Sequence, residues 1–300
     1  MIDNTFNKFA KKKVMSKRQK NISSDSIPKI VLFIAKSLQS ISTTLTVKFA
    51  KKLFSTPIKY KIPKREFEMN ANSKQEFILI PEISKKIMVY KYGTGNKKAL
   101  LVHGWSGRGT QLVKIADQLT EIGYSTISFD APAHGKSSGS STLMIEFIAS
   151  ILELEKKYGK FDIAIGHSLG GMSVLNSIKR GLKVNKAVII GSGDSINDIL
   201  HDFVKKMKLK PKIADLMRNS FEADFKESME NYSGSNAAKD VSVPVLVIHD
   251  KDDEDVPYTA SENIHKTLKN SELMITKSLG HRKVLGNEDV LLKIKNFVLN

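Results

Sequence analysis

Short apolar runs alternate with helix-length amphipathic segments along the chain from about residue 76 onward. Apolar runs with the length and composition of strands occupy residues 76–80, 86–92, 99–104, 125–130, 162–167, 186–192, 243–250 and 272–278. Helical periodicity separates most of them, at residues 109–122, 140–157, 169–180, 258–269 and 284–299. This order predicts an α/β fold with a mainly parallel eight-stranded sheet that carries helices on both faces.

The segment 193–240 interrupts the alternation, because it is too long for a simple crossover between two strands. Two or three short helices separated around Pro211 are expected there, forming a lid that lies over the strand ends and shapes the entrance to a site. The apolar residues of this lid either line a site for an acyl chain or form helix faces that pack on the core. They are Ile196, Ile199, Leu200, Phe203, Met207, Leu216, Met217, Phe221 and Phe225.

Residues 27–57 show a separate helical pattern before the sheet begins. Apolar residues recur there at steps of three and four, at Ile34, Leu38, Ile41, Leu45, Phe49 and Leu53. The longest uninterrupted apolar run, from Ile30 to Ala35, is far short of the roughly 20 residues of a membrane span, and it lacks the features of a secretory signal. We therefore expect residues 1–65 to form an N-terminal extension with an amphipathic helix, residues 66–300 to form the main domain, and the chain to be cytoplasmic.

Most of the excess positive charge belongs to this extension. The chain has 48 Lys and Arg against 31 Asp and Glu, a formal net charge of +17. Residues 1–65 hold 16 of these basic and 2 of these acidic residues, so they carry +14 of the charge and residues 66–300 carry +3. The amphipathic helix either packs on the main domain or rests on an anionic membrane surface. Nucleic acid is not expected as a partner, because no aromatic interleaving or recognised fold motif accompanies the lysines.

Ser168 stands between two glycines, Gly166 and Gly170, where a predicted strand gives way to a predicted helix. A strand that turns directly into a helix passes through a tight conformation, and its neighbours must be small to let two backbones approach. The hydroxyl is then exposed at the end of the sheet, and the N-terminus of the new helix directs its N–H groups toward a developing anion. This context predicts a nucleophilic serine, with a purely structural turn as the alternative.

A serine nucleophile requires a base and an acid that orients the base. His281 lies after the last predicted strand and before the last predicted helix, in a loop from which its side chain can reach across the strand ends. The acid candidates stand at the end of the strand 243–250 and directly after it, and composition does not choose among them. They are Asp250, Asp252, Asp253 and Asp255. The chain order of serine, acid and histidine is the order expected for a serine on such a turn.

Five motifs together resemble the α/β-hydrolase superfamily, over residues 76–300. They are LVHGW (101–105), FDAPAHGKS (129–137), GHSLGG (166–171), HDKDDEDVP (249–257) and GHR (280–282). The resemblance implies the α/β-hydrolase fold, with Ser168 as nucleophile, Asp253 as acid and His281 as base. It also implies an oxyanion hole formed by the backbone N–H groups of Trp105 and Leu169. One position departs from the family pattern: the acid loop usually reads His-Gly, and Asp250 replaces that glycine, so Asp250 and Asp252 stay open as alternative acids.

Several other polar residues of these motifs are expected to be structural. In the resemblance, Asp130 and His134 hold their turn together, and His103 braces the oxyanion loop. His167 lines the floor of the site, and His249 packs or hydrogen-bonds locally. No group of histidines and carboxylates has metal-ligand spacing, no glycine-rich phosphate loop is present, and the chain has no cysteine. No cofactor and no metal are therefore predicted.

These features predict a serine hydrolase that cleaves an ester-type acyl bond of a small-molecule substrate, as a carboxylesterase or a lipase does. A thioesterase, a peptidase or an acyltransferase on the same site is an alternative. A non-catalytic binding protein of the same fold, recruited to a membrane by residues 1–55, is an alternative of another class, against which the filled triad positions count. The serine at position 168 argues against the dehalogenases and epoxide hydrolases of this superfamily, which place an aspartate there.

Overall fold

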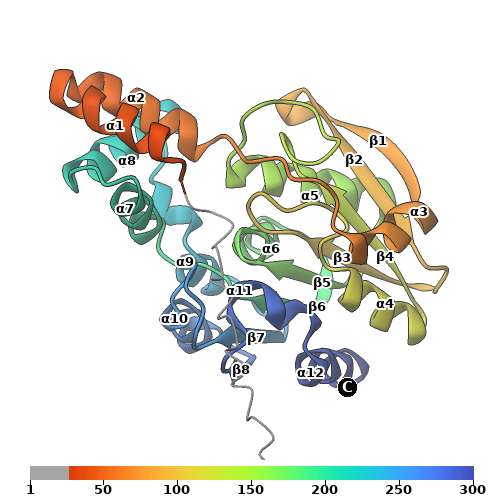
Figure 1. Cartoon of the computed structure of the whole chain (residues 1–300). Helices are drawn as coiled ribbons and strands as arrows, with labels where there is room; N and C mark the ends of the chain where they lie inside the picture. The colour runs from red at the N-terminus through yellow and green to blue at the C-terminus, as the bar shows by residue number, and fades with distance from the viewer. Residues whose placement is uncertain (1–26) are drawn as a thin grey trace, which may run out of the picture.

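The computed structural model describes residues 27–300, whose eight strands form one sheet (Figure 1). The strands are β1 (Lys74–Ile80), β2 (Lys85–Tyr92), β3 (Lys97–Val102), β4 (Tyr124–Asp130), β5 (Phe161–His167), β6 (Val184–Ile190), β7 (Val245–Asp250) and β8 (Ser271–Thr276). Their order across the sheet is β1-β2-β4-β3-β5-β6-β7-β8. Strand β2 pairs antiparallel with β1 and β4, and the other neighbouring strands pair in parallel. The predicted fold class is confirmed, and each predicted strand is present.

Helices cover both faces of this sheet, because its central strands are apolar on both sides. One face is covered by α3 (Phe67–Asn72), α4 (Val113–Glu121) and α12 (Glu288–Leu299). The other is covered by α5 (Met144–Tyr158), α6 (Leu169–Lys179), α9 (Gly234–Ala238) and α10 (Thr259–Thr267). Short helical turns complete the chain at η1 (Lys64–Glu66), η2 (Pro81–Ile83), η3 (Met229–Tyr232), α11 (Gly280–Lys283) and η4 (Val284–Gly286).

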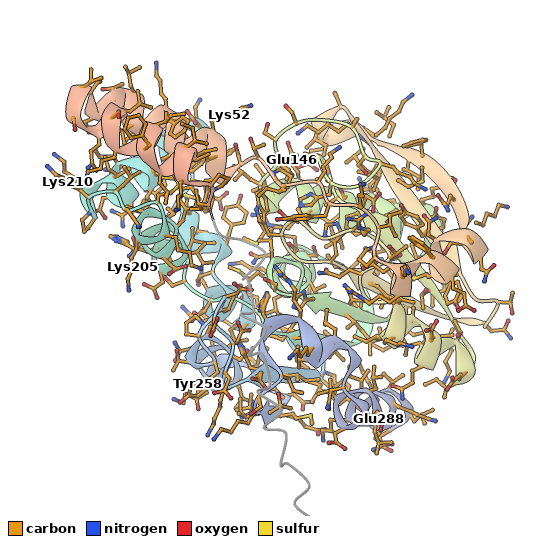
Figure 2. The ribbon with its side chains drawn as sticks, viewed as in Figure 1. Lys52, Glu146, Lys205, Lys210, Tyr258 and Glu288 are labelled. Atoms are coloured by element: carbon orange, nitrogen blue, oxygen red, sulfur yellow. The ribbon has the colours of Figure 1, made fainter. Side chains whose placement is uncertain are left out.

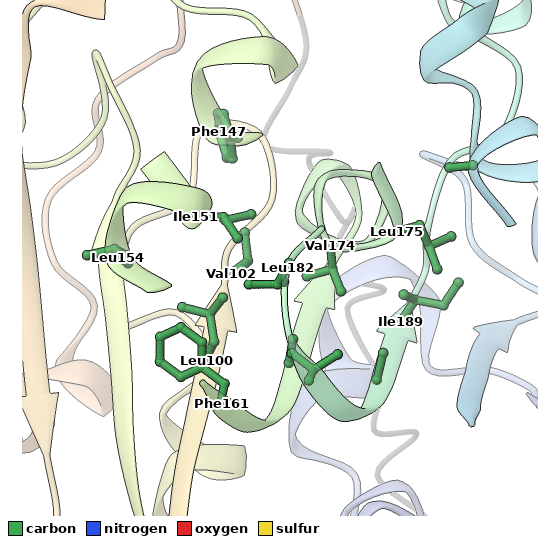
Figure 3. Packing of buried hydrophobic residues seen from close by; sticks show 14 of the residues in the cluster. Leu100, Val102, Phe147, Ile151, Leu154, Phe161, Val174, Leu175, Leu182 and Ile189 are labelled. Atoms are coloured by element: carbon green, nitrogen blue, oxygen red, sulfur yellow. The ribbon is translucent and has the colours of Figure 1, made fainter. Parts of the chain in front are cut away.

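The core follows from the alternation of side chains along each strand. In β3, Leu100 and Val102 pack with α5 and α6 (Figure 3), whereas Ala99 and Leu101 pack with α4 and α12. All four are at most 1% exposed. A strand that is buried on both faces reads as a continuous apolar run, which is why the sequence marks these strands clearly. The sheet is thereby a rigid base, and the loops at the ends of its parallel strands carry the polar motifs.

Four further helices form a body beside the sheet that we call the cap. The cap consists of α1 (Lys29–Ile41), α2 (Thr43–Phe54), α7 (Ile196–Lys206) and α8 (Lys212–Phe225) (Figure 1). These helices share an apolar cluster that also includes Met144 and Ile148 of α5 and Met172 of α6. Of the nine apolar residues named for the segment 193–240, seven lie in this cluster or pack against it, and Leu216 and Phe225 are exposed. Most of these nine residues therefore lie on helix faces that pack together, which is one of the two roles expected for them.

The predicted amphipathic helix of the extension is two helices, because the chain breaks at Ser42. Ser42 is extended, with φ −154° and ψ 122°, and its hydroxyl accepts a hydrogen bond from the N–H of Leu45 at 3.3 Å. Serine and threonine hydroxyls compete with the helical backbone in this way and favour helix starts. The break folds α2 back beside α1, so the apolar residues of the two helices are divided between the cap interior and the surface.

Residues 55–66 connect α2 to the sheet, and we call them the strap. The N–H of Ile58 donates to the hydroxyl of Ser106 at 3.0 Å, and the Arg108 guanidinium donates to the carbonyl of Tyr60 at 2.6 Å. The buried Glu66 carboxylate accepts from the hydroxyl of Thr110 at 2.7 Å. The strap thus runs along the loop that follows β3. Within residues 27–300, no helix has both the length and the apolar character needed to cross a bilayer.

Candidate active site

Ser168 occupies the turn between β5 and α6 in a strained backbone conformation, with φ 55° and ψ −122°. Such a conformation persists only where its surroundings enforce it, and it is common at functional sites. A Cβ atom at Gly166 would lie 2.3 Å from the carbonyl oxygen of Gly170, and one at Gly170 would lie 2.3 Å from that of Val102. Both glycines are therefore required by the close approach of β3, β5 and α6. The tight elbow expected from the sequence is present.

Asp253 and His281 form a hydrogen-bonded pair, with 2.7 Å between Oδ2 of Asp253 and Nδ1 of His281. The other carboxylate oxygen accepts the backbone N–H groups of Asp255 and Val256, both at 2.9 Å. Burial raises the pKa of Asp253, but hydrogen bonds from His249, His281 and the Val256 N–H outweigh burial and hold this pKa below its usual range. Asp253 is therefore an anion at neutral pH that fixes the His281 ring in one orientation.

His281 lies beside the elbow on the short helix α11, where the sequence analysis expected a loop. The Nε2 atom of His167, the residue before Ser168, is 2.9 Å from the backbone oxygen of His281, and the two rings are 4.6 Å apart between centroids. Within residues 27–300, neither the Ser168 hydroxyl nor Nε2 of His281 has a hydrogen-bond partner. Serine–histidine bonds are often loose in enzymes without substrate and tighten in the complex.

Asp250 and Asp252, the alternative acids, bind the backbone before His281 instead of its ring. Asp250 Oδ1 accepts the N–H groups of Gly280 at 2.9 Å and Asp252 at 3.0 Å. Its Oδ2 accepts the Thr276 hydroxyl at 2.7 Å and the Leu279 N–H at 3.1 Å. Asp252 accepts the Ser278 N–H at 3.0 Å. The two carboxylates thus hold residues 276–280 in place, and the geometry favours Asp253 as the acid.

Of the two residues expected to form an oxyanion hole, Leu169 follows Ser168 in sequence, and Trp105 follows Gly104, which lies against the elbow. Leu169 is the first residue of α6, so its N–H belongs to the positive end of a helix. Trp105 lies in the loop after β3, and a Cβ atom at the preceding Gly104 would lie 2.9 Å from Cβ of Ser168. Neither N–H group has an acceptor among the residues that the structure describes. Both groups are therefore available to a substrate oxygen.

Two buried histidines brace the loop that carries Trp105. His103 contacts the Gly104 carbonyl through Nδ1 at 2.6 Å and accepts the Ala131 N–H at Nε2 at 3.0 Å. His134 accepts the Ser106 N–H at Nε2 at 3.0 Å. Burial lowers the pKa of His103 to about 4 and, with the nearby His103, lowers the pKa of His134 to about 3. Both imidazoles are neutral at neutral pH, and each joins this loop to the turn that follows β4.

Asp130 holds that turn, as the sequence analysis expected. Its carboxylate accepts the N–H groups of Gly109 and Lys136, both at 2.7 Å, and the Tyr90 hydroxyl at 3.0 Å. A Cβ atom at Gly135, where φ is 43°, would lie 2.1 Å from Asp130 Oδ2. Burial and the adjacent Asp130 raise the pKa of Tyr90 above its usual range, so the tyrosine stays a hydrogen-bond donor. Asp130 is thereby structural.

His249 has a role that the sequence analysis missed. Its Nε2 atom lies 3.2 Å from Asp253 Oδ2 and 3.0 Å from the Val256 carbonyl, and its Nδ1 atom lies 2.6 Å from the Ser261 hydroxyl. The ring is fully buried. Only packing or local hydrogen bonding is expected for His249 from the sequence, although its position at the end of β7, four residues before Asp253, is a usable signal. His249 thus shares with His281 the carboxylate oxygen of the acid.

One group of side chains among the described residues has atoms close enough to hold a metal ion. In Asp253, Asp255 and His281, one ligand atom from each residue lies within 4.8 Å of the others. Two of these residues, Asp253 and His281, are already bonded to each other as the candidate acid and base. The group therefore overlaps the candidate site and is not a separate centre.

Two family models together match residues 100–300, which contain the candidate site. The family described as alpha/beta hydrolase fold matches residues 100–224, and the family described as TAP-like protein matches residues 223–300. The chain belongs to the α/β-hydrolase superfamily. A curated relative of this α/β-hydrolase, the 2-hydroxy-6-oxononadienedioate/2-hydroxy-6-oxononatrienedioate hydrolase of Escherichia coli (strain K12), is 26% identical, and the match covers 68% of this chain and 88% of the relative.

Solved structures of similar fold agree with this assignment. An esterase from Exiguobacterium antarcticum superposes with a TM-score of 0.60 at 18% identity, over 76% of this α/β-hydrolase and 100% of the esterase. A putative lipase from Acinetobacter baumannii AYE superposes with a TM-score of 0.61 at 17% identity, over 80% of this chain and 97% of the lipase. With the family matches and the hydrolase relatives, the protein is a hydrolytic enzyme, as the sequence analysis predicted.

Proposed function

We propose that this α/β-hydrolase is a serine esterase whose nucleophile, base and acid are Ser168, His281 and Asp253. The observation that carries the proposal is the buried Asp253–His281 pair, 2.7 Å between Oδ2 and Nδ1, held against an elbow on which Ser168 is strained. An ionised carboxylate on Nδ1 leaves Nε2 as the nitrogen that accepts a proton. The free N–H groups of Trp105 and Leu169 supply the oxyanion hole.

In the proposed reaction, Ser168 Oγ attacks the carbonyl carbon of an ester while His281 Nε2 takes the hydroxyl proton. The carbonyl oxygen becomes an oxyanion that accepts the N–H groups of Trp105 and Leu169. The tetrahedral intermediate collapses, the alcohol leaves with the proton from His281, and the acyl group stays on Ser168. Water then attacks this acyl-enzyme with His281 as base, which releases the carboxylic acid and restores the serine.

The surroundings of the elbow favour an apolar acyl group. Leu169 packs against the apolar cluster of the cap, and Met172, one helical turn later, lies inside it. A Cβ atom at Gly193 would lie 3.0 Å from the Met172 sulfur and 3.2 Å from Cδ1 of Ile199. The chain that leaves β6 therefore passes between apolar side chains of α6 and α7. An ester of a simple aliphatic acid fits this setting better than a charged substrate does.

A second candidate comes from the curated relative, whose name specifies a hydroxy-oxo-dienedioate, a dicarboxylate without an ester group. The observation that favours it is the 26% identity over 68% of this chain. The same serine and histidine would serve that reaction. Two substrate carboxylates would, however, require cationic partners beside the elbow, where Leu169 and Met172 are apolar and Arg282 is a cation whose charge acts on His167.

A panel of p-nitrophenyl esters from acetate to laurate, with an acyl thioester, an anilide and 2-hydroxy-6-oxononadienedioate, tests the proposal. We expect saturable ester hydrolysis, little activity on the dioate, and a loss of at least about 1,000-fold in kcat for Ser168→Ala. Transfer of the acyl group to an added alcohol would indicate an acyltransferase. Preference for the dioate, the thioester or the anilide would refute the esterase assignment in favour of a dioate hydrolase, a thioesterase or a peptidase. Equal rates for the wild type and Ser168→Ala would refute Ser168 as the nucleophile.

A further inference from the structure

The α1–α2 hairpin exposes a row of large apolar side chains. Ile30, Phe33, Ile34 and Ile41 of α1 are 63%, 67%, 39% and 77% exposed, and Leu45 at the start of α2 is 48% exposed. Steps of three, four and seven residues place the four α1 side chains on one face of that helix. We call these five residues the hairpin stripe. Single exposed apolar residues are ordinary, whereas a row on one helix face marks an interaction surface.

The opposite side of the hairpin is fixed to the rest of the cap, at α7 and at the segment between α7 and α8. Ala35 and Ala50 are buried there, and the Phe54 ring lies 5.2 Å from the ring of Phe203. The Lys210 N–H donates to the side-chain oxygen of Gln39 at 2.7 Å. The hairpin is therefore an integral part of the fold, and the stripe is held in place on its outer side.

Positive charge accompanies the stripe. Residues 27–55 contain five lysines and no acidic residue. Lys51 is bonded to Asp224 at 2.7 Å on the cap, while Lys29, Lys36, Lys48 and Lys52 are exposed and make no ion pair with a described residue. Figure 2 labels Lys52 on α2, with Lys205 and Lys210 on the neighbouring part of the cap, away from the sheet. An apolar row bordered by lysines is complementary to a surface that is both anionic and apolar.

We propose that the hairpin stripe docks on an anionic lipid bilayer, with the apolar side chains among the acyl chains and the lysines at the headgroups. Two other occupants fit the charge poorly. A second copy of the chain would bring an equally basic surface into contact. Residues 1–26 carry seven basic residues against Asp3 and Asp25, so they too would be repelled by the lysines that border the stripe. A bilayer that contains acidic lipids attracts both the lysines beside the stripe and the basic residues of 1–26.

Flotation of the full-length protein with phosphatidylcholine vesicles, with and without phosphatidylglycerol, tests this surface. We expect binding that requires the anionic lipid and falls with salt. Phe33→Ser/Ile41→Ser should weaken partition at least about tenfold, because two large apolar side chains lose their contact with acyl chains. Lys48→Glu/Lys52→Glu should weaken it at least about fivefold for each lysine. The matched control is Leu292→Ser/Leu299→Ser on α12, where the two leucines are 54% and 55% exposed, and it should bind as the wild type does.

Each alternative has its own result. Unchanged binding of Phe33→Ser/Ile41→Ser would overturn the proposal, because the attraction would then come from lysines of the hairpin or from residues 1–26 and not from the stripe; equal binding to both kinds of vesicle would also overturn it. A dimer in light scattering that Phe33→Ser/Ile41→Ser dissociates would assign the stripe to a second copy. Hydrolysis of a water-soluble p-nitrophenyl ester should be unchanged in all three double variants, because none of their residues lies at the elbow. Vesicle binding is therefore measured independently of the proposed esterase activity.

Discussion

Replacing Asp250 by asparagine should loosen residues 276–280, the segment that positions His281. The carboxylate is 1% exposed, and each of its oxygens accepts two hydrogen bonds, from Gly280, Asp252, Thr276 and Leu279, at 2.7 to 3.1 Å. In its better orientation, asparagine keeps an acceptor oxygen for the Gly280 and Asp252 N–H groups and turns its NH₂ group toward the Thr276 hydroxyl, which can accept, so the bond from the Leu279 N–H is lost. At about 1.5 to 3 kcal/mol for a hydrogen bond to a buried charge, the loss of this bond should lower the free energy of unfolding by about 1.5 to 3 kcal/mol.

The same change should slow the reaction, because these bonds end one residue before His281. A displacement of a catalytic group by about 1 Å typically costs about 100-fold in rate. We expect Asp250→Asn to lower kcat on a p-nitrophenyl ester by that order, with a smaller change in KM. Urea unfolding and steady-state kinetics, both under conditions where the variant is folded, measure the two effects.

Asp252→Asn is the matched control for this experiment. Asp252 is a neighbouring carboxylate on the same segment, but it is exposed, and among residues 27–300 it accepts from one residue, Ser278, through the N–H at 3.0 Å and the hydroxyl at 3.4 Å. It should lose less than about 1 kcal/mol of stability and keep most of its activity. If Asp250→Asn and Asp252→Asn prove equally mild, the four bonds to Asp250 do not position His281, and the assignment of Asp250 as the anchor of this segment is wrong.

Three further predictions concern the acid, its second partner and the buried histidines. Asp253→Asn should lower kcat at least about 1,000-fold while leaving a folded protein, measured by ester hydrolysis and circular dichroism; a small effect would exclude Asp253 as the acid. His249→Leu should lower kcat about tenfold, because the Asp253 carboxylate then loses one of the two imidazoles that bind Oδ2, measured by ester hydrolysis; a kcat equal to that of the wild type would leave His249 with a packing role only. The depressed pKa values of His103 and His134, about 4 and about 3, mean that the unfolded chain binds more protons below pH ~6.5, so stability should fall as the pH drops from about 6.5 to about 4. For His103 alone the loss should be about 3 kcal/mol in urea unfolding, and His103→Gln should flatten this slope; an unchanged slope would contradict the neutral buried imidazole.

The fold and the elbow could be predicted because their signals are local. Each central strand is a run of apolar residues in sequence, and the glycines around Ser168 are required by contacts within a few residues of the turn and with the adjacent strand. The candidate acid could not be chosen in the same way. Asp250, Asp252 and Asp253 follow one strand together, and what separates them is whether each meets a backbone N–H or an imidazole nearly thirty residues away in the chain.

The N-terminal extension shows where periodicity alone is insufficient. The recurrence of apolar residues from Ile34 to Leu53 is continuous in sequence, yet Ser42 caps a new helix in the middle of it. The apolar positions of this pattern therefore divide between two surfaces: Leu53 and Phe49 pack in the interior of the cap, whereas Ile41 and Leu45 are exposed. The division depends on the partner helices α7 and α8, which lie about 150 residues further along the chain.

The identity of the nucleophile is tested most directly by a fluorophosphonate probe followed by intact-mass and peptide mass spectrometry. A serine activated by the Asp253–His281 pair should be phosphonylated once per chain, on the peptide that contains Ser168, and Ser168→Ala should remain unlabelled. Labelling of a different residue, retained labelling of Ser168→Ala, or an unreactive wild-type protein would contradict the account of this site as that of a serine hydrolase.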